Sequence, residues 1–229
     1  MPARKKVPED LTAKKELALE VISRLKKEYP DAGCTLDYNH AWQLLVSVRL
    51  AAQCTDARVN IVVEDLFAKY PSVAALAAAE PEEIEAIVKP CGLGHSKARD
   101  ISACMRMLRD KYDCQVPTTF EELLALPGVG RKSANLIMGD VFGKPAIVTD
   151  THCIRLCNKI GLVDGIKEPR KVEMALWRII PPEEGSDLCH RFVMHGRAVC
   201  NARKPECEKC CLKDICRFAR ESAGQDAVL

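Results

Sequence analysis

The sequence predicts an all-α protein, and two observations lead to this fold class. Apolar residues recur at helical spacing in one segment after another, and proline, glycine or polar residues interrupt them at short intervals. No segment shows the sustained alternation of apolar and polar residues that is typical of a half-buried strand. Short connectors between many helices favour two helical subdomains that pack face to face, with a cleft between them.

The positions of the apolar residues and the breakers give each helix in turn. In the first half of the chain, the predicted helices cover residues 11–27, 41–52, 59–70, 73–79, a segment from 81, and 97–112. The loop before the last of these is rich in glycine and other breakers. In the second half, the predicted helices are a short one that ends at residue 125, followed by 131–141, 153–160, 169–180 and 186–200.

A glycine-rich hairpin joins the helix that ends at residue 125 to the one that begins at Arg131. Gly128 and Gly130 are expected to let the backbone turn tightly and expose its N–H groups beside a helix N-terminus. The positive end of the helix dipole then makes this turn a natural anion site. Lys132 lies in the first turn of the second helix. The hairpin therefore predicts a phosphate clamp with an amine beside it.

The chain has thirteen cysteines, and five of them crowd between Cys200 and Cys216. The other eight are scattered, mostly in apolar helical settings, and are expected to be small buried hydrophobes. Four members of the cluster can converge on one inorganic centre, with intervals of six, two and five residues: Cys200, Cys207, Cys210 and Cys216. Both zinc and an iron–sulfur cluster accept four thiolates. The unequal short loops favour the iron–sulfur cluster and leave zinc open.

Charge and hydropathy limit the partners and the compartment. The net charge is only +2, but eight lysine and arginine residues stand against three acidic ones between His190 and Arg220. Such a basic segment, which includes Arg203 and Lys204, is suited to holding phosphates. No run of 18 apolar residues exists, so no membrane span is expected. With no apolar leader at the start and so many thiols, we expect a reducing, cytoplasmic location.

These motifs together resemble the endonuclease III family of DNA base-excision repair glycosylases, within the helix-hairpin-helix glycosylase superfamily. The resemblance spans nearly the whole chain in the family's order. It is carried by the four spaced cysteines and by four segments: residues 52–56 (AQCTD), 92–97 (GLGHSK), 126–132 (LPGVGRK) and 148–152 (VTDTH). The hairpin alone is shared with non-enzymatic DNA-binding proteins, whereas the full combination is highly specific.

The resemblance implies both an architecture and a cofactor. Residues 34–144 would form a six-helix barrel with the helix-hairpin-helix, and residues 1–33 with 145–229 would form a cluster subdomain. The four spaced cysteines would hold a 4Fe–4S cluster, while Cys211 has no ligand role in the family pattern. The implied partner is damaged double-stranded DNA, bound by a monomer in the cytoplasm at the nucleoid.

The resemblance also implies a bifunctional DNA glycosylase and abasic-site lyase that removes oxidised pyrimidines. Asp150 would stabilise the cation that develops at C1′, and Lys132 would attack C1′, form a Schiff base and permit β-elimination. The alternatives are a phosphate-contacting Lys132 and an Asp150 that caps the helix after it. Relatives that only remove a base carry a glutamate on the second helix, and residues 44–52 contain no acid.

Three further residues receive expected roles from the resemblance. Gln53 and Leu93 look like wedge residues that fill the gap left by a flipped nucleotide, and His152 would position Asp150 or contact DNA. Gly94 departs from many relatives, in which a bulkier residue stands. The competing function is a non-catalytic helix-hairpin-helix protein that keeps the cluster for DNA binding or redox sensing. The presence of both Lys132 and Asp150 favours the enzyme.

Overall fold

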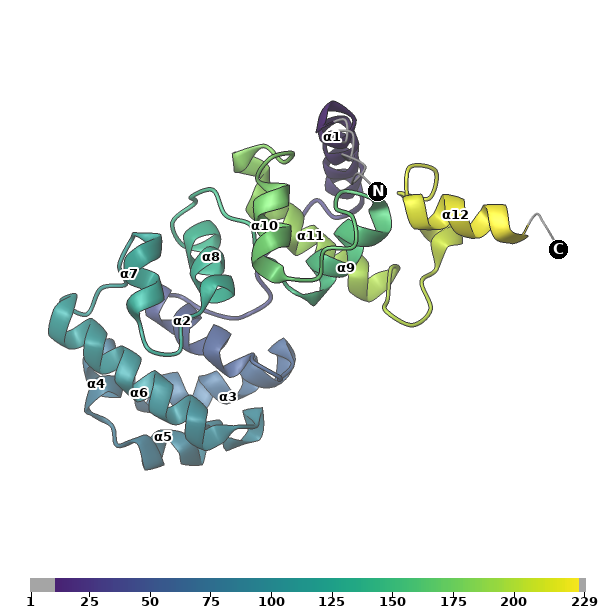
Figure 1. Ribbon diagram of the computed structural model, residues 1–229. Coiled ribbons are helices and arrows are strands. Elements are labelled where there is room, and N and C mark those ends of the chain that lie inside the picture. The colour runs from purple at the N-terminus through teal and green to yellow at the C-terminus, as the bar shows by residue number, and fades with distance from the viewer. Residues whose placement is uncertain (1–10, 227–229) are drawn as a thin grey trace, which may run out of the picture. The chain divides into compact units, whose positions relative to one another are not determined.

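The structure, a computed structural model, describes residues 11–226 (Figure 1). Every regular element within this range is a helix, so the prediction of an all-α fold is confirmed. Contacts divide the chain into two compact units. Cys34–Lys144 forms the middle unit, and the described residues up to Gly33 and from Pro145 onward form the outer unit.

The middle unit contains seven α-helices, one more than the six of the implied barrel. They are α2 (Ala41–Leu50), α3 (Asp56–Lys69), α4 (Val73–Ala78), α5 (Pro81–Val88), α6 (Gly94–Lys111), α7 (Phe120–Ala125) and α8 (Arg131–Asp140), with a 3-10 turn at Lys89–Cys91. The long helix α6 packs against α4 and α5 (Figure 1). Its inward residues Ile101, Met105 and Leu108 are buried. They join one continuous apolar core to which all the longer helices of the unit contribute.

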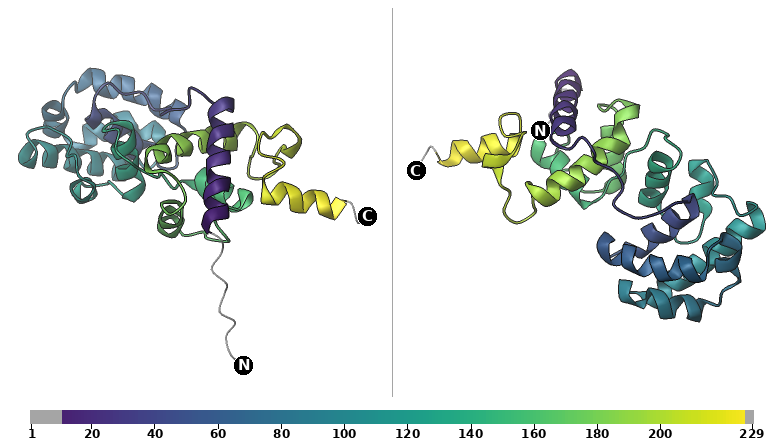
Figure 2. Two further views of the ribbon diagram at one scale, coloured as in Figure 1. Left: turned by 90° about the horizontal axis from the view of Figure 1, so that it is seen from above. Right: turned by 180° about the vertical axis from the view of Figure 1, so that it is seen from behind.

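The outer unit joins the first helix to the last third of the chain. Its α-helices are α1 (Leu11–Glu28), α9 (Thr151–Ile160), α10 (Pro169–Leu176), α11 (Gly185–Ala198) and α12 (Arg217–Asp226), with 3-10 turns at Pro182–Glu184 and Cys207–Lys209. Helix α11 packs against both α1 and α9 (Figure 2). The core side chains of these helices, such as Leu25, Leu156 and Phe192, have no exposed surface.

Local sequence signals explain where five of the helices begin. Thr55, Ser72 and Thr119 each accept a hydrogen bond from the backbone N–H three residues later, which satisfies an otherwise unpaired donor at the start of α3, α4 and α7. Prolines occupy the first positions of α5 and α10, where no backbone donor is needed. Among the described residues, no helix combines the length and the apolar character needed to cross a membrane.

Three helices differ from the sequence prediction by three residues or more at one end, and a fourth was not predicted. Helix α3 begins at Asp56 instead of residue 59, because Thr55 caps it. Helix α6 begins at Gly94 instead of residue 97, because the positive φ angles of Gly92 and Leu93 complete the turn immediately before it. Helix α10 ends at Leu176 instead of residue 180, since the backbone tightens at Trp177. Helix α12 was not predicted, because its sequence has few apolar residues to give a period.

Candidate functional site

The hairpin between α7 and α8 depends on one of its two glycines. Gly128 has a φ of +74°. A Cβ atom there would lie 2.9 Å from Cβ of Asp100 and 3.2 Å from Cδ of Arg49. Gly130 has a φ of −97°, which any residue adopts, and a Cβ would meet nothing within 4 Å. The tight turn therefore requires glycine at residue 128, whereas the backbone at Gly130 is open to other residues.

The start of α8 presents its backbone donors beside Lys132. The first backbone bond of the helix runs from the N–H of Ala134 to the oxygen of Gly130, at 2.9 Å. The N–H groups of the preceding turn have no partner within a helix, as at any helix N-terminus. Gly130 has no side chain to cap them, and Lys132 is exposed in the same turn. The guanidinium of Arg131 instead lies 4.9 Å from the centre of the Phe120 ring, which joins α8 to α7.

An ion pair lies under this hairpin and was missed by sequence reasoning. Arg49 on α2 contacts Asp100 on α6 through Nε (2.8 Å) and Nη2 (2.7 Å), both to Oδ2. Its Nη2 also donates to the hydroxyl of Ser96, at 3.2 Å. Both charged side chains are about three-quarters buried. The pair packs against Gly128, so it fixes the hairpin relative to α2 and α6.

The two expected wedge residues share an unusual backbone conformation. Gln53 has a φ of 57° and Leu93 a φ of 51°, in the left-handed region that costs a non-glycine residue about 1–3 kcal/mol. Both side chains are exposed, and Leu93, a large apolar residue, is 57% exposed. Exposed side chains on strained turns are common at functional sites, because the strain persists only where the surroundings enforce it.

Asp150 in the outer unit caps helix α9. Its Oδ1 accepts a hydrogen bond from the N–H of Cys153, at 2.7 Å, and the residue is partly exposed. The structural alternative for Asp150 is therefore confirmed, and capping does not exclude catalysis because a carboxylate has a second oxygen.

His152 lies in the first turn of α9 and contacts Arg155. Its Nδ1 is 3.1 Å from Nη2 of Arg155. The same Arg155 nitrogen donates to the carbonyl oxygens of Gly196 (3.2 Å) and Cys200 (2.8 Å). His152 also lies against Gly196, where an added Cβ would approach its Nδ1 to 2.4 Å. His152 thus belongs to the packing between α9 and the end of α11.

The four spaced cysteines follow α11 and end at the start of α12. Cys216 is buried, and Cys200, Cys207 and Cys210 are partly buried. Burial raises the pKa of Cys210 to about 12, and the nearby thiols of Cys200 and Cys216 add to this effect. The sulfur atoms therefore lie in one region. Among the described side chains, no three His, Cys, Asp or Glu residues are grouped so as to hold a metal ion.

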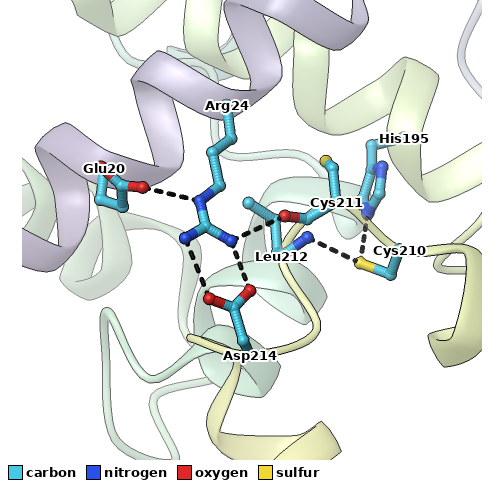
Figure 3. A network of polar contacts seen from close by, with 7 residues as sticks. All are labelled: Glu20, Arg24, His195, Cys210, Cys211, Leu212 and Asp214. Carbon is cyan, nitrogen blue, oxygen red and sulfur yellow. Dashed lines mark hydrogen bonds and ion pairs between the residues drawn. The ribbon is translucent and has the colours of Figure 1, made fainter.

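Arg24 of α1 holds the cysteine loop in place (Figure 3). Its Nη1 donates to the carbonyl oxygen of Cys211 at 3.0 Å, and its Nη2 donates to Asp214 at 3.0 Å. Its Nε donates to Glu20 at 2.7 Å, so the guanidinium is fixed on both sides. Cys211 takes part in this network through its carbonyl group.

Two donors point at the sulfur of Cys210 (Figure 3). Nε2 of His195 lies 3.2 Å from it, and the N–H of Leu212 lies 3.4 Å from it. Nδ1 of His195 lies 3.1 Å from the Tyr29 hydroxyl. Burial lowers the pKa of His195, which favours the neutral ring. A hydroxyl that donates to Nδ1 leaves the proton on Nε2, where it faces the sulfur. Nothing in the sequence indicated that Tyr29 and His195 lie beside the cysteine loop.

The two basic residues proposed to contact DNA lie in the same loop. Arg203 and Lys204 are exposed between Cys200 and Cys207. The N–H of Lys204 donates to the side-chain oxygen of Asn201, at 2.7 Å, which shapes the turn that carries them. The basic residues between Cys200 and Cys207 indicated an exposed loop, and the structure places them in one.

Comparisons with known proteins agree with these motifs. The family model described as "HhH-GPD superfamily base excision DNA repair protein" matches residues 46–182. Endonuclease III of Synechocystis sp. is 43% identical over 213 residues, which are 93% of this chain and 97% of that protein. Endonuclease III of Escherichia coli (strain K12) is 36% identical over 200 residues, which are 87% of this chain and 94% of that protein.

Solved structures give the same result. A structure described as a trapped covalent intermediate of endonuclease III with DNA has a TM-score of 0.86 and 40% identity, and covers 91% of this chain and 98% of its own. A thermostable thymine-DNA glycosylase, with a TM-score of 0.80 and 21% identity, shares the fold and covers 93% of this chain and 100% of its own. The chain therefore belongs to the HhH-GPD superfamily of base excision DNA repair proteins and, within it, to the endonuclease III family.

Proposed function

We propose that this chain removes oxidised pyrimidines from damaged double-stranded DNA and cleaves the strand 3′ to the resulting abasic site, with Lys132 as nucleophile. A base-excision repair DNA glycosylase and lyase is the activity that the family implies. One observation carries the finer proposal: Lys132 is an exposed amine in the first turn of α8, next to backbone donors that can hold a phosphate. A similar structure is described as a covalent intermediate with DNA, and such a bond requires a nucleophile on the protein.

The chemistry assigns one step to each of two residues. The damaged nucleotide first leaves the base stack, since C1′ cannot be reached inside the duplex. The carboxylate of Asp150 then stabilises the positive charge that develops at C1′ as the bond to the base breaks. The nitrogen of Lys132 forms a bond to C1′, and the opened sugar becomes a Schiff base. The Schiff base acidifies C2′, so loss of that proton expels the 3′ phosphate.

The same surface features hold the DNA. The N–H groups at the start of α8 would bind one phosphate, and the exposed Arg203 and Lys204 would bind others. Gln53 and Leu93 would occupy the space that the flipped nucleotide leaves. The strained, exposed turns on which they stand support this role.

The donor set around the cysteine loop fits a 4Fe–4S cluster held by Cys200, Cys207, Cys210 and Cys216. Four thiols lie in one short segment, and His195 and Leu212 direct N–H groups at one of the sulfurs. Such donors are typical of the surroundings of thiolate ligands. A bound cluster would supply a rigid centre, open to redox change, behind the basic loop. This chain's own contribution is the Arg24 network, which fixes the loop on α1.

We also propose that the protein is a monomer and that it acts in the cytoplasm, at the nucleoid. Thirteen cysteines without a disulfide among those described suit a reducing compartment. The competing function, a non-catalytic DNA-binding or redox-sensing protein, is not favoured by the family to which the chain belongs.

Borohydride trapping on DNA with an abasic site tests the nucleophile. Reduction of the Schiff base should leave wild-type protein covalently bound to DNA, and Lys132→Gln should lose the adduct while still binding the duplex. Lys111→Gln is the matched control, since Lys111 is an exposed lysine at the end of α6. Wild-type protein that forms no covalent adduct with the DNA and does not cleave the strand would contradict the lyase proposal. A trapped Lys132→Gln protein would show that another amine attacks.

A further inference from the structure

Lys97 on α6 is a lysine with no exposed surface. Its ammonium group donates hydrogen bonds to two backbone carbonyl oxygens, those of Leu50 and Cys91, each at 2.8 Å. Its own backbone N–H donates to a third carbonyl, that of Leu93, at 3.0 Å. Lysine is rarely buried completely, because removing its charge from water is costly unless strong partners replace the water. Here the carbonyl oxygens of Leu50 and Cys91 take the place of the water.

The two carbonyls bonded by the ammonium group belong to two separate segments of the chain. Leu50 is the last residue of α2, and Gln53 follows three positions later. Cys91 ends the 3-10 turn after α5, and Leu93 follows two positions later. Carbonyls at helix ends have no partner within the helix, and a positive charge there is stabilised by the helix dipole. Lys97 thus links the two residues that precede the turn after α2 and the turn before α6.

Those two turns carry two of the four strained non-glycine residues of the middle unit. Four non-glycine residues in the described part of the chain have a positive φ angle: Gln53, Leu93, Asp113 and Cys114. Asp113 and Cys114 follow the end of α6, and the N–H of Cys114 donates back to the carbonyl oxygen of Leu108 at 3.0 Å, as at many helix ends. Gln53 and Leu93 stand instead on the turns tied by Lys97. Strain of this kind persists only where surrounding contacts enforce it.

We propose that Lys97 is a positioning residue, which holds the turn after α2 and the turn before α6 so that Gln53 and Leu93 are presented together to duplex DNA. The inference rests on the proposed function, in which these two side chains fill the gap in the base stack. It adds the residue that keeps both turns in place. Lys97 is buried and does not itself reach DNA, so its effect is confined to steps that need the two turns.

Two substrates separate positioning from chemistry. A duplex with an oxidised pyrimidine requires a flipped nucleotide and a filled gap. A single-stranded oligonucleotide with an abasic site requires neither, and tests only the attack by Lys132 and the elimination. Lys97→Met keeps the length of the side chain but removes its donors. We expect its rate on the duplex to fall about tenfold or more, and its rate on the single strand to stay within about twofold.

Arg106→Met is the matched control. Arg106 is also on α6 and also donates to two backbone carbonyls, those of Ala77 (3.2 Å) and Ala79 (3.4 Å), but these belong to the end of α4. The control should lose similar bonds and leave the ratio of the two rates unchanged. Lys97→Gln, which keeps one donor group, should show the same imbalance to a smaller degree. Circular dichroism and thermal melting check that each variant is folded.

The outcomes are distinct. A folded Lys97→Met protein with full duplex activity overturns the inference, as does an equal loss on both substrates. Failure of both Lys97 variants to fold would make Lys97 a residue of the core alone, and would also overturn it. A wild-type protein inactive on both substrates would instead overturn the proposed function.

Discussion

Gly128 and Asp100 approach so closely that a single methyl group at residue 128 would collide with the Asp100 side chain, with 2.9 Å between the two Cβ atoms. The contact matters because Asp100 is held by Arg49, and the pair supports the hairpin from below. Gly128 also has a positive φ angle. Residue 128 of the hairpin therefore requires glycine for two reasons: there is no space for a Cβ atom, and the φ angle is positive.

Gly128→Ala should destabilise the protein by about 2–3 kcal/mol, because a methyl group there meets both a clash and a disfavoured φ angle. Gly130→Ala is the matched control, since its conformation suits any residue and its added Cβ meets nothing. The control should lose less than about 1 kcal/mol. Urea unfolding of the two variants measures the difference, and equal losses would contradict this account of the turn.

Asp150→Asn separates the capping role of Asp150 from the catalytic one. Asparagine caps helices about as well as aspartate, so the stability of this variant should match the wild type. Its neutral side chain cannot stabilise a cation, so base excision should fall about a hundredfold or more. Asp150→Ala should lose excision and also about 1 kcal/mol of stability, because the bond to the N–H of Cys153 disappears. Full excision activity in the asparagine variant would exclude the catalytic role.

Replacing cysteines one at a time should sort ligands from bystanders. Serine at Cys200, Cys207, Cys210 or Cys216 should lower the iron and acid-labile sulfide content of purified protein, since a hydroxyl is a poor substitute for a thiolate. Cys211→Ser should keep both, because Cys211 enters the loop network through its carbonyl oxygen. Zinc in place of iron and sulfide in the wild-type protein would rule out the iron–sulfur assignment.

Arg24→Gln should loosen the cysteine loop. The substitution removes the guanidinium from Asp214 and from the Cys211 carbonyl, and solvent screening limits the expected loss to about 1 kcal/mol. Lys27→Gln, one turn along the exposed part of α1, is the control and should change stability by less. Thermal melting compares the two variants. An unchanged melting temperature for Arg24→Gln would show that the cysteine loop does not depend on Arg24 for its stability.

Removing the charges of Arg203 and Lys204 should weaken binding to duplex DNA of any sequence. The slope of log affinity against log salt should fall by about one for each phosphate that is no longer neutralised, and so by about two for the double glutamine variant. Lys111→Gln, remote in sequence from this loop, should keep the wild-type slope. A double variant with the wild-type slope would show that other residues bind the phosphates.

Local features of the protein were open to sequence reasoning because they depend on residues a few positions apart. Most of the helices, the cap at Thr119 and the αL turn at Gly128 follow from such short-range rules. The spacing of the cysteines and the lysine after the hairpin are likewise read directly from the chain. The family model and the relatives confirm the family that these motifs indicated.

Contacts between distant residues were decided only by tertiary structure. Lys97 reaches Leu50 across 47 positions, Arg49 reaches Asp100 across 51, and Arg24 reaches Asp214 across 190. Periodicity gives each of these residues a helix but not a partner, because the partner depends on how whole helices pack. Thus the sequence by itself determined the fold class, the family and the candidate chemistry. The packing decided which charged side chains support the hairpin, the two strained turns and the cysteine loop.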